Sequence, residues 1–191
     1  MTNTIKYGVI GTGIMGQEHI QNINIIENAE VVAICDTNEN SRNQTKSLVK
    51  DSTKFYNDLD ELISKNIADA YIIATPNFTH INILERILKT NKHLLIEKPL
   101  CTTTEDCKKF ELMSKNYSKI IWTGMEYRYM PPVQQLIKEV HNNVIGKIKM
   151  LSIREHRFPF LHKVDDWNRF AVNTGGTLVE KCCHFFDLMR L

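Results

Sequence analysis

A carboxylate and an imidazole stand four residues apart in the stretch GGTLVEKCCHFFDLMRL, which covers residues 175–191. If this stretch is helical, Glu180 and His184 lie on one face, and spacings of three residues add Thr177 and Asp187 to it. Histidine titrates near neutral pH, and a carboxylate one turn away can orient the ring and stabilise the imidazolium. A general base that removes a proton from a substrate is one interpretation of this spacing.

Two other interpretations of this stretch compete with the general base. Cys182, Cys183 and His184 are the residue types that bind zinc. However, consecutive helical residues point about 100° apart, so the three side chains cannot readily converge on one ion, and we predict no metal site. In the second alternative, His184 is a satisfied core histidine and Glu180 is a solvated charge.

A glycine-rich turn follows the first apolar run, in YGVIGTGIMGQEHI. Gly11 permits a tight turn, Gly13 lets the backbone approach a pyrophosphate, and Gly16 lets the next helix pack closely against the strand. Ile14 and Met15 open that helix, whose N–H groups and dipole favour phosphates. The pattern predicts a dinucleotide site, although the glycines could serve only to shape the turn.

Asp36 ends the second apolar run, twenty residues after Gly16. A carboxylate at this place accepts hydrogen bonds from a ribose 2′-hydroxyl and repels a 2′-phosphate, so NAD is favoured over NADP. Arg42 would offset that repulsion if its loop folds back. The alternative is that Asp36 only caps a strand.

Two further motifs, ATPNFTH and IEKPL, end predicted strands, at the sheet edge where ligands of open parallel sheets bind. Lys98 is expected beside the nicotinamide, although it could equally be a solvated surface lysine. The remaining cofactor candidates in these two motifs are Thr75, Pro76, Asn77, His80 and Glu97.

Candidate substrate residues occur in EYRYMPP and DDWNRF. Tyr127, Arg128, Trp167 and Asn168 offer aromatic surface with amide and guanidinium donors, which suits a polyhydroxylated ligand. Each of them could equally pack one domain against another.

The elements that must position these residues alternate between apolar strands and amphipathic helices, which predicts an α/β fold with a parallel sheet. The runs at 7–11, 31–36, 69–75, 93–99 and 120–124 suit strands covered on both faces. Helices are expected at 81–90, with Ile81, Leu84 and Leu88 on one stripe, and after Thr103, where Asp106 completes a capping box. The order predicts a doubly wound Rossmann domain over residues 1–124.

The pattern changes after Gly124, and we place a second domain at residues 125–191. A helix is expected at 130–140, with Pro132 near its first turn. The run GKIKMLSIREHRF at 146–158 alternates partly with period two and predicts a strand of a different sheet.

Composition limits the possible partners and compartment. A net charge of +2 without a long basic run argues against nucleic acid, and no apolar run approaches membrane-spanning length. The five cysteines form no metal-ligand pairs, as expected of reduced thiols. The N-terminus lacks a leader pattern. We expect a cytoplasmic protein.

Together, GxGxMGxxH, ATPNxxH, EKP, and GG followed by a carboxylate and His184 closely resemble the Gfo/Idh/MocA oxidoreductases across essentially the whole chain. The resemblance implies an N-terminal Rossmann domain followed by an α/β domain with a large open antiparallel sheet, which serves substrate binding and homo-oligomerisation. Members are typically much longer, so we expect the whole cofactor domain and only the beginning of the second domain here.

The same resemblance implies an NAD-dependent dehydrogenase that oxidises a secondary hydroxyl of a sugar or cyclitol. Lys98 would position and polarise the reacting oxygen, and His184 would take the proton with help from Glu180. Glu180 replaces the aspartate common in inositol dehydrogenase-like members, which leaves its role open. Two alternatives are an NAD-dependent glycoside hydrolase of the same family and a truncated, non-catalytic NAD-binding module.

Overall fold

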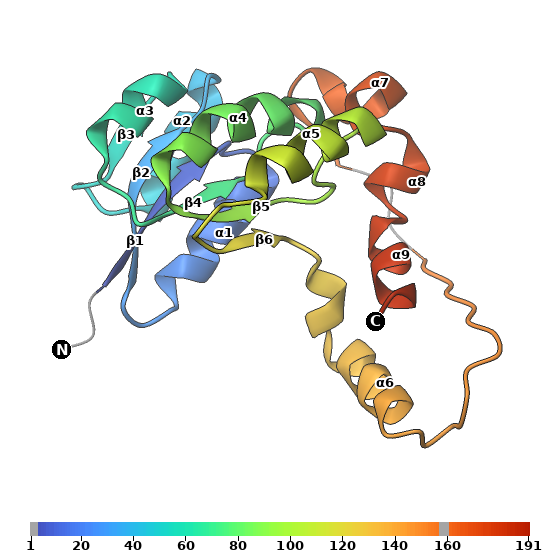
Figure 1. The fold of residues 1–191 in the computed structure, drawn as a ribbon. Helices are drawn as coiled ribbons and strands as arrows, with labels where there is room; N and C mark the ends of the chain where they lie inside the picture. Colours follow the sequence, from blue (N-terminus) through green and yellow to red (C-terminus); the bar gives the residue numbers. More distant parts are fainter. Residues whose placement is uncertain (1–3, 157–160) are drawn as a thin grey trace.

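The computed structural model describes residues 4–156 and 161–191 and centres on one parallel sheet (Figure 1). Its six strands run in the order β3-β2-β1-β4-β5-β6. The strands are β1 (Ile5–Ile10), β2 (Ala29–Cys35), β3 (Lys54–Tyr56), β4 (Ala70–Ile73), β5 (His93–Ile96) and β6 (Ile121–Thr123). The order reverses between β1 and β4, which creates the crevice where ligands of such sheets bind. The predicted parallel α/β sheet is confirmed.

Helices cover both faces of the sheet, which explains why its central strands are so apolar. One core packs α3 (Leu59–Lys65), α4 (His80–Ile87) and α5 (Thr104–Ser114) against the sheet, and a second core packs α1 (Ile14–Asn24) against the opposite face. Figure 1 shows α4 and α5 above the sheet and α1 below it. All four residues of β4 are buried between these layers.

Local signals fix the ends of several of these helices. Thr103 caps α5, because its Oγ1 accepts from the Asp106 backbone N–H at 3.1 Å and donates to Asp106 Oδ2 at 2.8 Å. The N-cap half of the predicted capping box is therefore present, and Asp106 bonds the Thr103 hydroxyl. On α4 the expected apolar stripe is also present, since Ile81 and Leu84 are buried in the core.

The remaining elements are short or leave the sheet. They are α2 (Glu39–Thr45), the 3₁₀ turns η1 (Lys46–Leu48), η2 (Asn77–Thr79), η3 (Leu88–Thr90), η4 (Glu126–Tyr129) and η5 (Val164–Arg169), and the helices α6 (Pro131–His141), α7 (Ala171–Thr174), α8 (Thr177–Glu180) and α9 (Cys183–Met189). Figure 1 shows α6 projecting away from the sheet, while α7, α8 and α9 descend along the edge of the sheet body. The predicted helix at 130–140 is confirmed, with Pro131 and Pro132 in its first turn.

The strand expected at 146–158 is wrong for its described part. Residues 147–156 form neither a strand nor a helix, and Met150 is 87% exposed. A strand requires a hydrogen-bonding neighbour, and no strand of the described chain lies beside this segment. Arg157 and Phe158 lie outside the described residues. The open antiparallel sheet is likewise absent from residues 4–156 and 161–191.

The single helix expected from Thr177 onward is also wrong. The chain makes one turn as α8, breaks at Lys181 and Cys182, and resumes as α9. In a continuous helix the Glu180 carbonyl would accept the His184 backbone N–H. Here that carbonyl oxygen accepts a hydrogen bond from Lys98 Nζ at 3.3 Å. The break therefore brings the backbone of Glu180 to the sheet edge.

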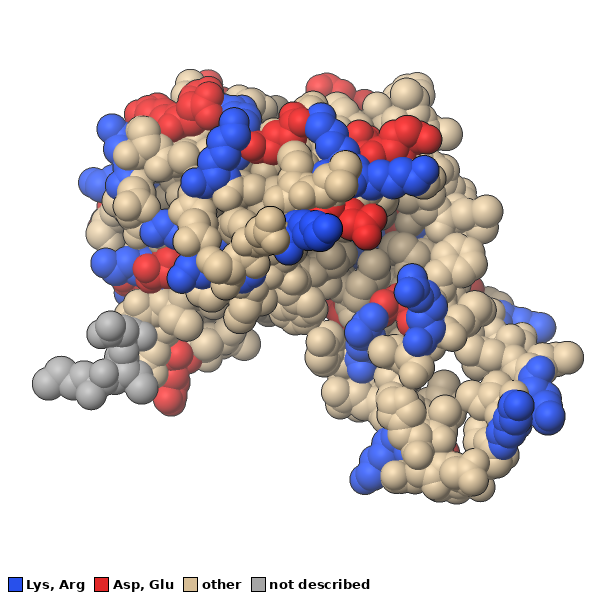
Figure 2. All heavy atoms as spheres, in the orientation of Figure 1, with Lys and Arg blue, Asp and Glu red and all other residues tan. Residues whose placement is uncertain are grey.

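Charges of both signs are mixed over the helices that cover the sheet, whereas the projecting lobe around α6 shows few acidic side chains (Figure 2). No helix within the described ranges has both the length and the apolar content needed to cross a bilayer.

Candidate active site

The glycine loop forms the tight connection that its spacing predicted. Gly11 has φ +85°, and a Cβ there would lie 2.7 Å from the Ala74 backbone at the end of β4. A Cβ on Gly16 would overlap the Gly11 carbonyl oxygen. At Gly13, by contrast, a Cβ would meet no atom within 4 Å. Two glycines therefore close the turn, and the third leaves open space over the N-terminus of α1, where a pyrophosphate fits.

The carboxylate of Asp36 stands at the end of β2, directly beside this loop. Its Oδ2 accepts from the Thr12 backbone N–H at 2.6 Å and from the Thr12 hydroxyl at 3.0 Å, and its Oδ1 accepts from the Asn38 N–H at 2.8 Å. Arg42 folds back and donates from Nη1 to the Asp36 carbonyl oxygen at 2.5 Å. A carboxylate and a guanidinium therefore share the place where an adenosine ribose would lie.

Glu97 ends β5 as a buried carboxylate that is bound from two sides. Its Oε1 lies 2.7 Å from His19 Nε2 on α1, and its Oε2 accepts from the Lys98 backbone N–H at 3.2 Å. Burial alone would raise the pKa of Glu97, but the hydrogen bond and charge of His19, together with Lys98, hold that pKa below its usual range. The pair joins α1 to the loop that carries Lys98.

His80 links the loop after β4 to the loop after β5. Its ring is fully buried, with Nε2 lying 3.0 Å from the Thr75 carbonyl oxygen and Nδ1 lying 3.0 Å from that of Pro99. Burial lowers the pKa of the ring, although these carbonyl oxygens partly offset the effect. A neutral ring can donate to only one of them at a time. His80 therefore has the geometry of a brace beneath the cofactor loops.

The loop after β4 is held by its own hydrogen bonds except at one buried amide. Thr75 and Pro76 are held by the Thr79 hydroxyl, at 2.8 Å to Thr75 Oγ1 and 2.7 Å to the Pro76 carbonyl oxygen. Asn77 is buried, and its Nδ2 has no hydrogen-bond partner among the described residues. A buried amide donor without an acceptor suits contact with a ligand. The loop thus fits the cofactor that the glycine turn implies.

The second half of the chain meets the sheet edge at Lys98. Besides the bond to the Glu180 carbonyl, a Cβ on Gly175 would lie only 2.6 Å from the Thr102 carbonyl oxygen, so the GG turn packs tightly on the loop after Lys98. The Glu180 carboxylate pairs with Lys181 Nζ at 3.3 Å. Lys98 and Glu180 are therefore brought together, through the backbone of the glutamate.

The His184 side chain packs against two residues of η4. The ring is 3% exposed, stacks on Tyr127 with centroids 4.0 Å apart, and places Nε2 3.4 Å from Glu126 Oε1. Tyr127 donates in turn to Glu155 Oε1 at 2.7 Å. Among the described residues, the structure pairs the imidazole with the carboxylate of Glu126, whereas the Glu180 carboxylate pairs with Lys181.

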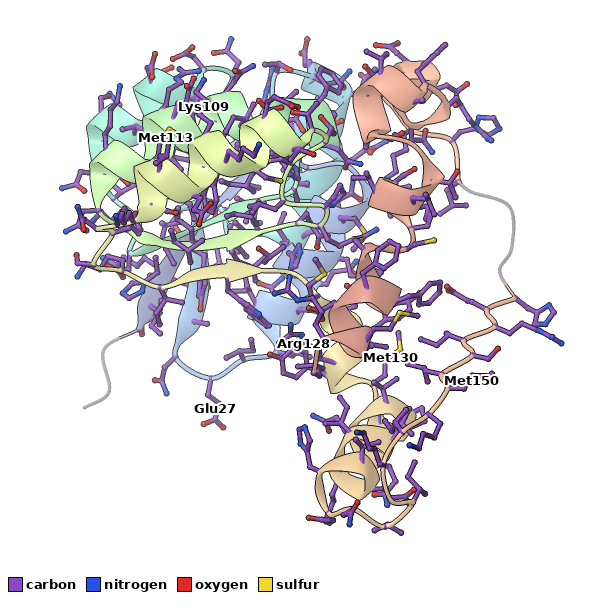
Figure 3. All side chains as sticks on the ribbon, turned by 45° about the vertical axis from the view of Figure 1, so that its right-hand side comes forward. Glu27, Lys109, Met113, Arg128, Met130 and Met150 are labelled. Carbon is purple, nitrogen blue, oxygen red and sulfur yellow. The ribbon has the colours of Figure 1, made fainter. Side chains whose placement is uncertain are left out.

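The other substrate candidates fall into two groups. Arg128 forms a two-pronged ion pair with Asp187 and so ties η4 to α9, as its position in Figure 3 illustrates. Trp167 packs edge-on against Phe78 in the loop after β4, with ring centroids 6.4 Å apart. Asn168 Oδ1 is buried without a partner in the described chain. Trp167 and Asn168 thus lie near the cofactor loops, whereas Arg128 is engaged in packing.

Three residues of this site carried no assigned role in the sequence analysis. His19 stands three residues after Gly16 in the GxGxMGxxH motif, but nothing in the sequence pairs it with Glu97, 78 residues later. Glu126 lies next to the predicted Tyr127 and could have been found by its position. Lys163 lies near Lys98 in space, although no recognisable motif contains it.

Comparison with known proteins agrees with this geometry. The model of an oxidoreductase family described as an NAD-binding Rossmann fold matches residues 5–125, and that of the family's C-terminal alpha/beta domain matches residues 137–191. Myo-inositol 2-dehydrogenase of Thermotoga maritima is 30% identical over 186 residues, which are 97% of this chain and 54% of that protein. Glucose-6-phosphate 3-dehydrogenase of Bacillus subtilis is 31% identical over 193 residues, covering 96% of this chain and 52% of that protein.

A solved structure gives the same result. The crystal structure of myo-inositol dehydrogenase from Lactobacillus casei in complex with NAD(H) and myo-inositol matches with a TM-score of 0.70 at 31% identity, covering 75% of this chain and 43% of that chain. The chain spans about half the length of the curated relatives it matches. With both family models matched in order and the glycine loop, Asp36 and EKP motif in place, the chain belongs to the Gfo/Idh/MocA oxidoreductase family.

Proposed function

We propose that the protein is an NAD-dependent dehydrogenase that oxidises a secondary hydroxyl of a sugar or cyclitol. The observation that carries this proposal is the meeting of Lys98, at the carboxyl end of β5, with the Glu180 backbone of the second half. This contact supports the proposal, because it joins an ammonium group at the carboxyl end of β5 to the segment that carries His184. The family relatives named as inositol and sugar-phosphate dehydrogenases support the substrate class.

In this proposal the chain's own groups hold the cofactor from three sides. The N–H groups at the start of α1 contact the pyrophosphate above Gly13, Asp36 accepts from the ribose hydroxyls, and the Asn77 amide contacts the nicotinamide half. When bound, NAD accepts the hydride released from the substrate carbon. Asp36 favours NAD by repelling a 2′-phosphate, while Arg42 weakens that repulsion.

The proton follows a separate path in this proposal. Lys98 donates a hydrogen bond to the reacting hydroxyl oxygen, which favours the negative charge that develops as the proton leaves. His184 takes the proton, and the carboxylate of Glu126, which faces Nε2 at 3.4 Å, stabilises the resulting imidazolium. Tyr127 holds the ring in place by stacking. Glu180 contributes its backbone carbonyl, which orients Lys98.

The experiment is an NADH-formation assay with myo-inositol, scyllo-inositol and D-glucose, comparing the parent with Lys98→Met, His184→Ala and the control Lys147→Met. Each of the first two variants should lower kcat by roughly a hundredfold or more if proton transfer depends on these groups. Lys147 lies in the exposed segment and should not matter. Near-parent turnover in Lys98→Met would refute the assignment of the lysine. Release of sugar from a glycoside without net NADH would identify the hydrolase alternative instead.

A further inference from the structure

A second lysine lies at the same sheet edge as Lys98. Lys163 immediately precedes η5, and its Nζ is 5.4 Å from the centroid of the Trp167 ring. That ring packs in turn against Phe78 in the loop after β4, next to Asn77. Because Trp167 is fixed between the lysine and the loop, the Lys163 ammonium is held beside the proposed cofactor site rather than extended into solvent.

Lys163 has acidic groups in its surroundings, Glu180 and Glu97, but it forms no ion pair with either of them in the described chain. In the part of the chain that the structure describes, no carboxylate lies within ion-pair distance of its Nζ. The acidic groups that face it are already bound elsewhere: Glu180 pairs with Lys181 at 3.3 Å, and Glu97 lies 2.7 Å from His19. The Trp167 ring offers only the weak attraction of an aromatic face.

An ammonium without an ion pair in this place is costly to the protein. Burial lowers the pKa of Lys163, and repulsion from Lys98 lowers it further, although Glu180 and Glu97 act in the opposite direction. A partly buried cation is normally paired with an anion. Two lysines facing one region without such a partner form a site that a bound anion would complete.

We propose that Lys163 binds an anionic substituent of the substrate, so that the compound oxidised is a sugar acid or a sugar phosphate rather than a neutral polyol. The inference rests on the proposed function for the presence of a sugar at this edge. Lys98 contacts the reacting hydroxyl, while Lys163 contacts the carboxylate or phosphate and fixes which hydroxyl reacts. Asn168 follows Trp167, and its buried Oδ1 lacks a partner among the described residues. In this proposal that oxygen accepts from another hydroxyl of the same ligand.

Calorimetric titration of the NADH-bound protein with D-glucose, D-glucuronate and D-glucose 6-phosphate tests the preference and separates the two anion classes. The parent should bind one anionic sugar roughly tenfold or more tightly than D-glucose, as a charge-assisted hydrogen bond allows. Lys163→Met should abolish that advantage, Lys163→Arg should keep most of it, and the exposed control Lys147→Met should match the parent. An advantage that survives Lys163→Met would overturn the proposal, as would equal affinities in the parent.

A second measurement does not depend on the choice of sugar. NMR of ¹³C-dimethylated lysines, with Lys163→Arg used to assign the signal, follows the pKa of Lys163 as inorganic phosphate, acetate or glycerol is added. Phosphate or acetate should raise this pKa, and glycerol should not. If neither anion shifted the pKa of Lys163, the proposal would be overturned. An equal pKa shift caused by NADH alone would also overturn it, because Lys163 would then bind a phosphate of the cofactor rather than the substrate. Failure to bind NADH would count against the proposed function, whereas a preference for neutral sugars would count only against the role of Lys163.

Discussion

At the scale of single residues, the cofactor preference depends on two opposite charges at the end of β2. Asp36 presents its carboxylate beside the glycine loop, and Arg42 folds back onto the Asp36 carbonyl. The carboxylate disfavours a 2′-phosphate, and the guanidinium favours it. We therefore expect their balance, rather than Asp36 alone, to set the ratio of NAD to NADP affinity.

We predict that the parent binds NAD more tightly than NADP, that Asp36→Ala narrows the difference, and that Arg42→Ala widens it by weakening NADP. Each change should be roughly tenfold, the effect of one charge-assisted contact. Calorimetry with both cofactors measures it, and Arg86→Ala serves as control because Arg86 pairs with Asp60 on the protein surface. Tighter binding of NADP by the parent would show that Arg42 dominates.

The buried pair of His19 and Glu97 yields a second prediction at this scale. Because the pKa of Glu97 is held below its usual range, its contribution to stability is present above the ordinary carboxyl pKa and lost as pH falls through the lowered value. His19→Leu removes the main group that lowers this pKa and leaves burial, which raises it, so the loss of stability in acid that Glu97 causes should shrink or reverse. Urea unfolding at a series of acidic pH values measures the change.

His19→Leu should also lower kcat more than it raises the KM for NAD, because the Lys98 loop loses its anchor while the glycine loop remains. His19→Gln keeps a side-chain donor and should restore most of both properties. The exposed His141 provides a matched control through His141→Leu. If His19→Leu and His141→Leu give the same acid-unfolding profile, the pair has no role in holding the loop.

The sequence alone predicted which residues belong to the site better than it predicted which of them contact one another. Local spacing identified Gly11, Asp36 and Lys98, because each lies at a strand end within a recognisable motif. The partners of His184 could not be predicted in this way. The expected Glu180 contact assumed a continuous helix, and the contact with Glu126 depends on how η4 and α9 pack.

At the scale of elements, the close approach of α1 to β1 and β4 distinguishes two glycines that look equivalent in the motif. Gly16→Ala forces a methyl group onto the Gly11 carbonyl and should destabilise the fold by about 1–3 kcal/mol. Gly13→Ala meets open space, so the fold should be nearly unaffected while NAD binding weakens. Thermal unfolding and NAD titration of both variants separate these effects. Equal losses of stability would contradict the geometry.

Elements defined by local signals were predicted, and those defined by tertiary contacts were not. The Thr103 cap and the apolar stripe of α4 are encoded in adjacent residues. Strand β3 was missed because its three residues are too few to show a period, and it forms by pairing with β2. The break between α8 and α9 also depends on a tertiary contact. Lys98, more than eighty positions away in the sequence, donates a hydrogen bond to the Glu180 carbonyl oxygen.

At the scale of the whole molecule, residues 147–156, which follow α6, form neither a strand nor a helix. They make no backbone–backbone hydrogen bond with another described residue, whereas the sheet body is buried on both faces. We predict that trypsin under native conditions cuts first after Lys147, Lys149 or Arg154. Mass spectrometry identifies the sites, and the N-terminal product should still bind NAD, because the glycine loop, Asp36 and Asn77 all precede the cut. Early cleavage inside the sheet body would contradict this division.

The position of Trp167 gives the protein an optical reporter of its own site. The chain has two tryptophans, and the other, Trp122, packs on Tyr129 at β6. Trp167 touches Phe78 on one side and has the Lys163 ammonium over its ring, so its emission should respond to whatever occupies the cofactor loops or neutralises that charge. In a Trp122→Phe background, quenching by bound NADH and a spectral shift on adding an anion would be read from one fluorophore. Occupancy of the two proposed sites could then be followed in real time without any label.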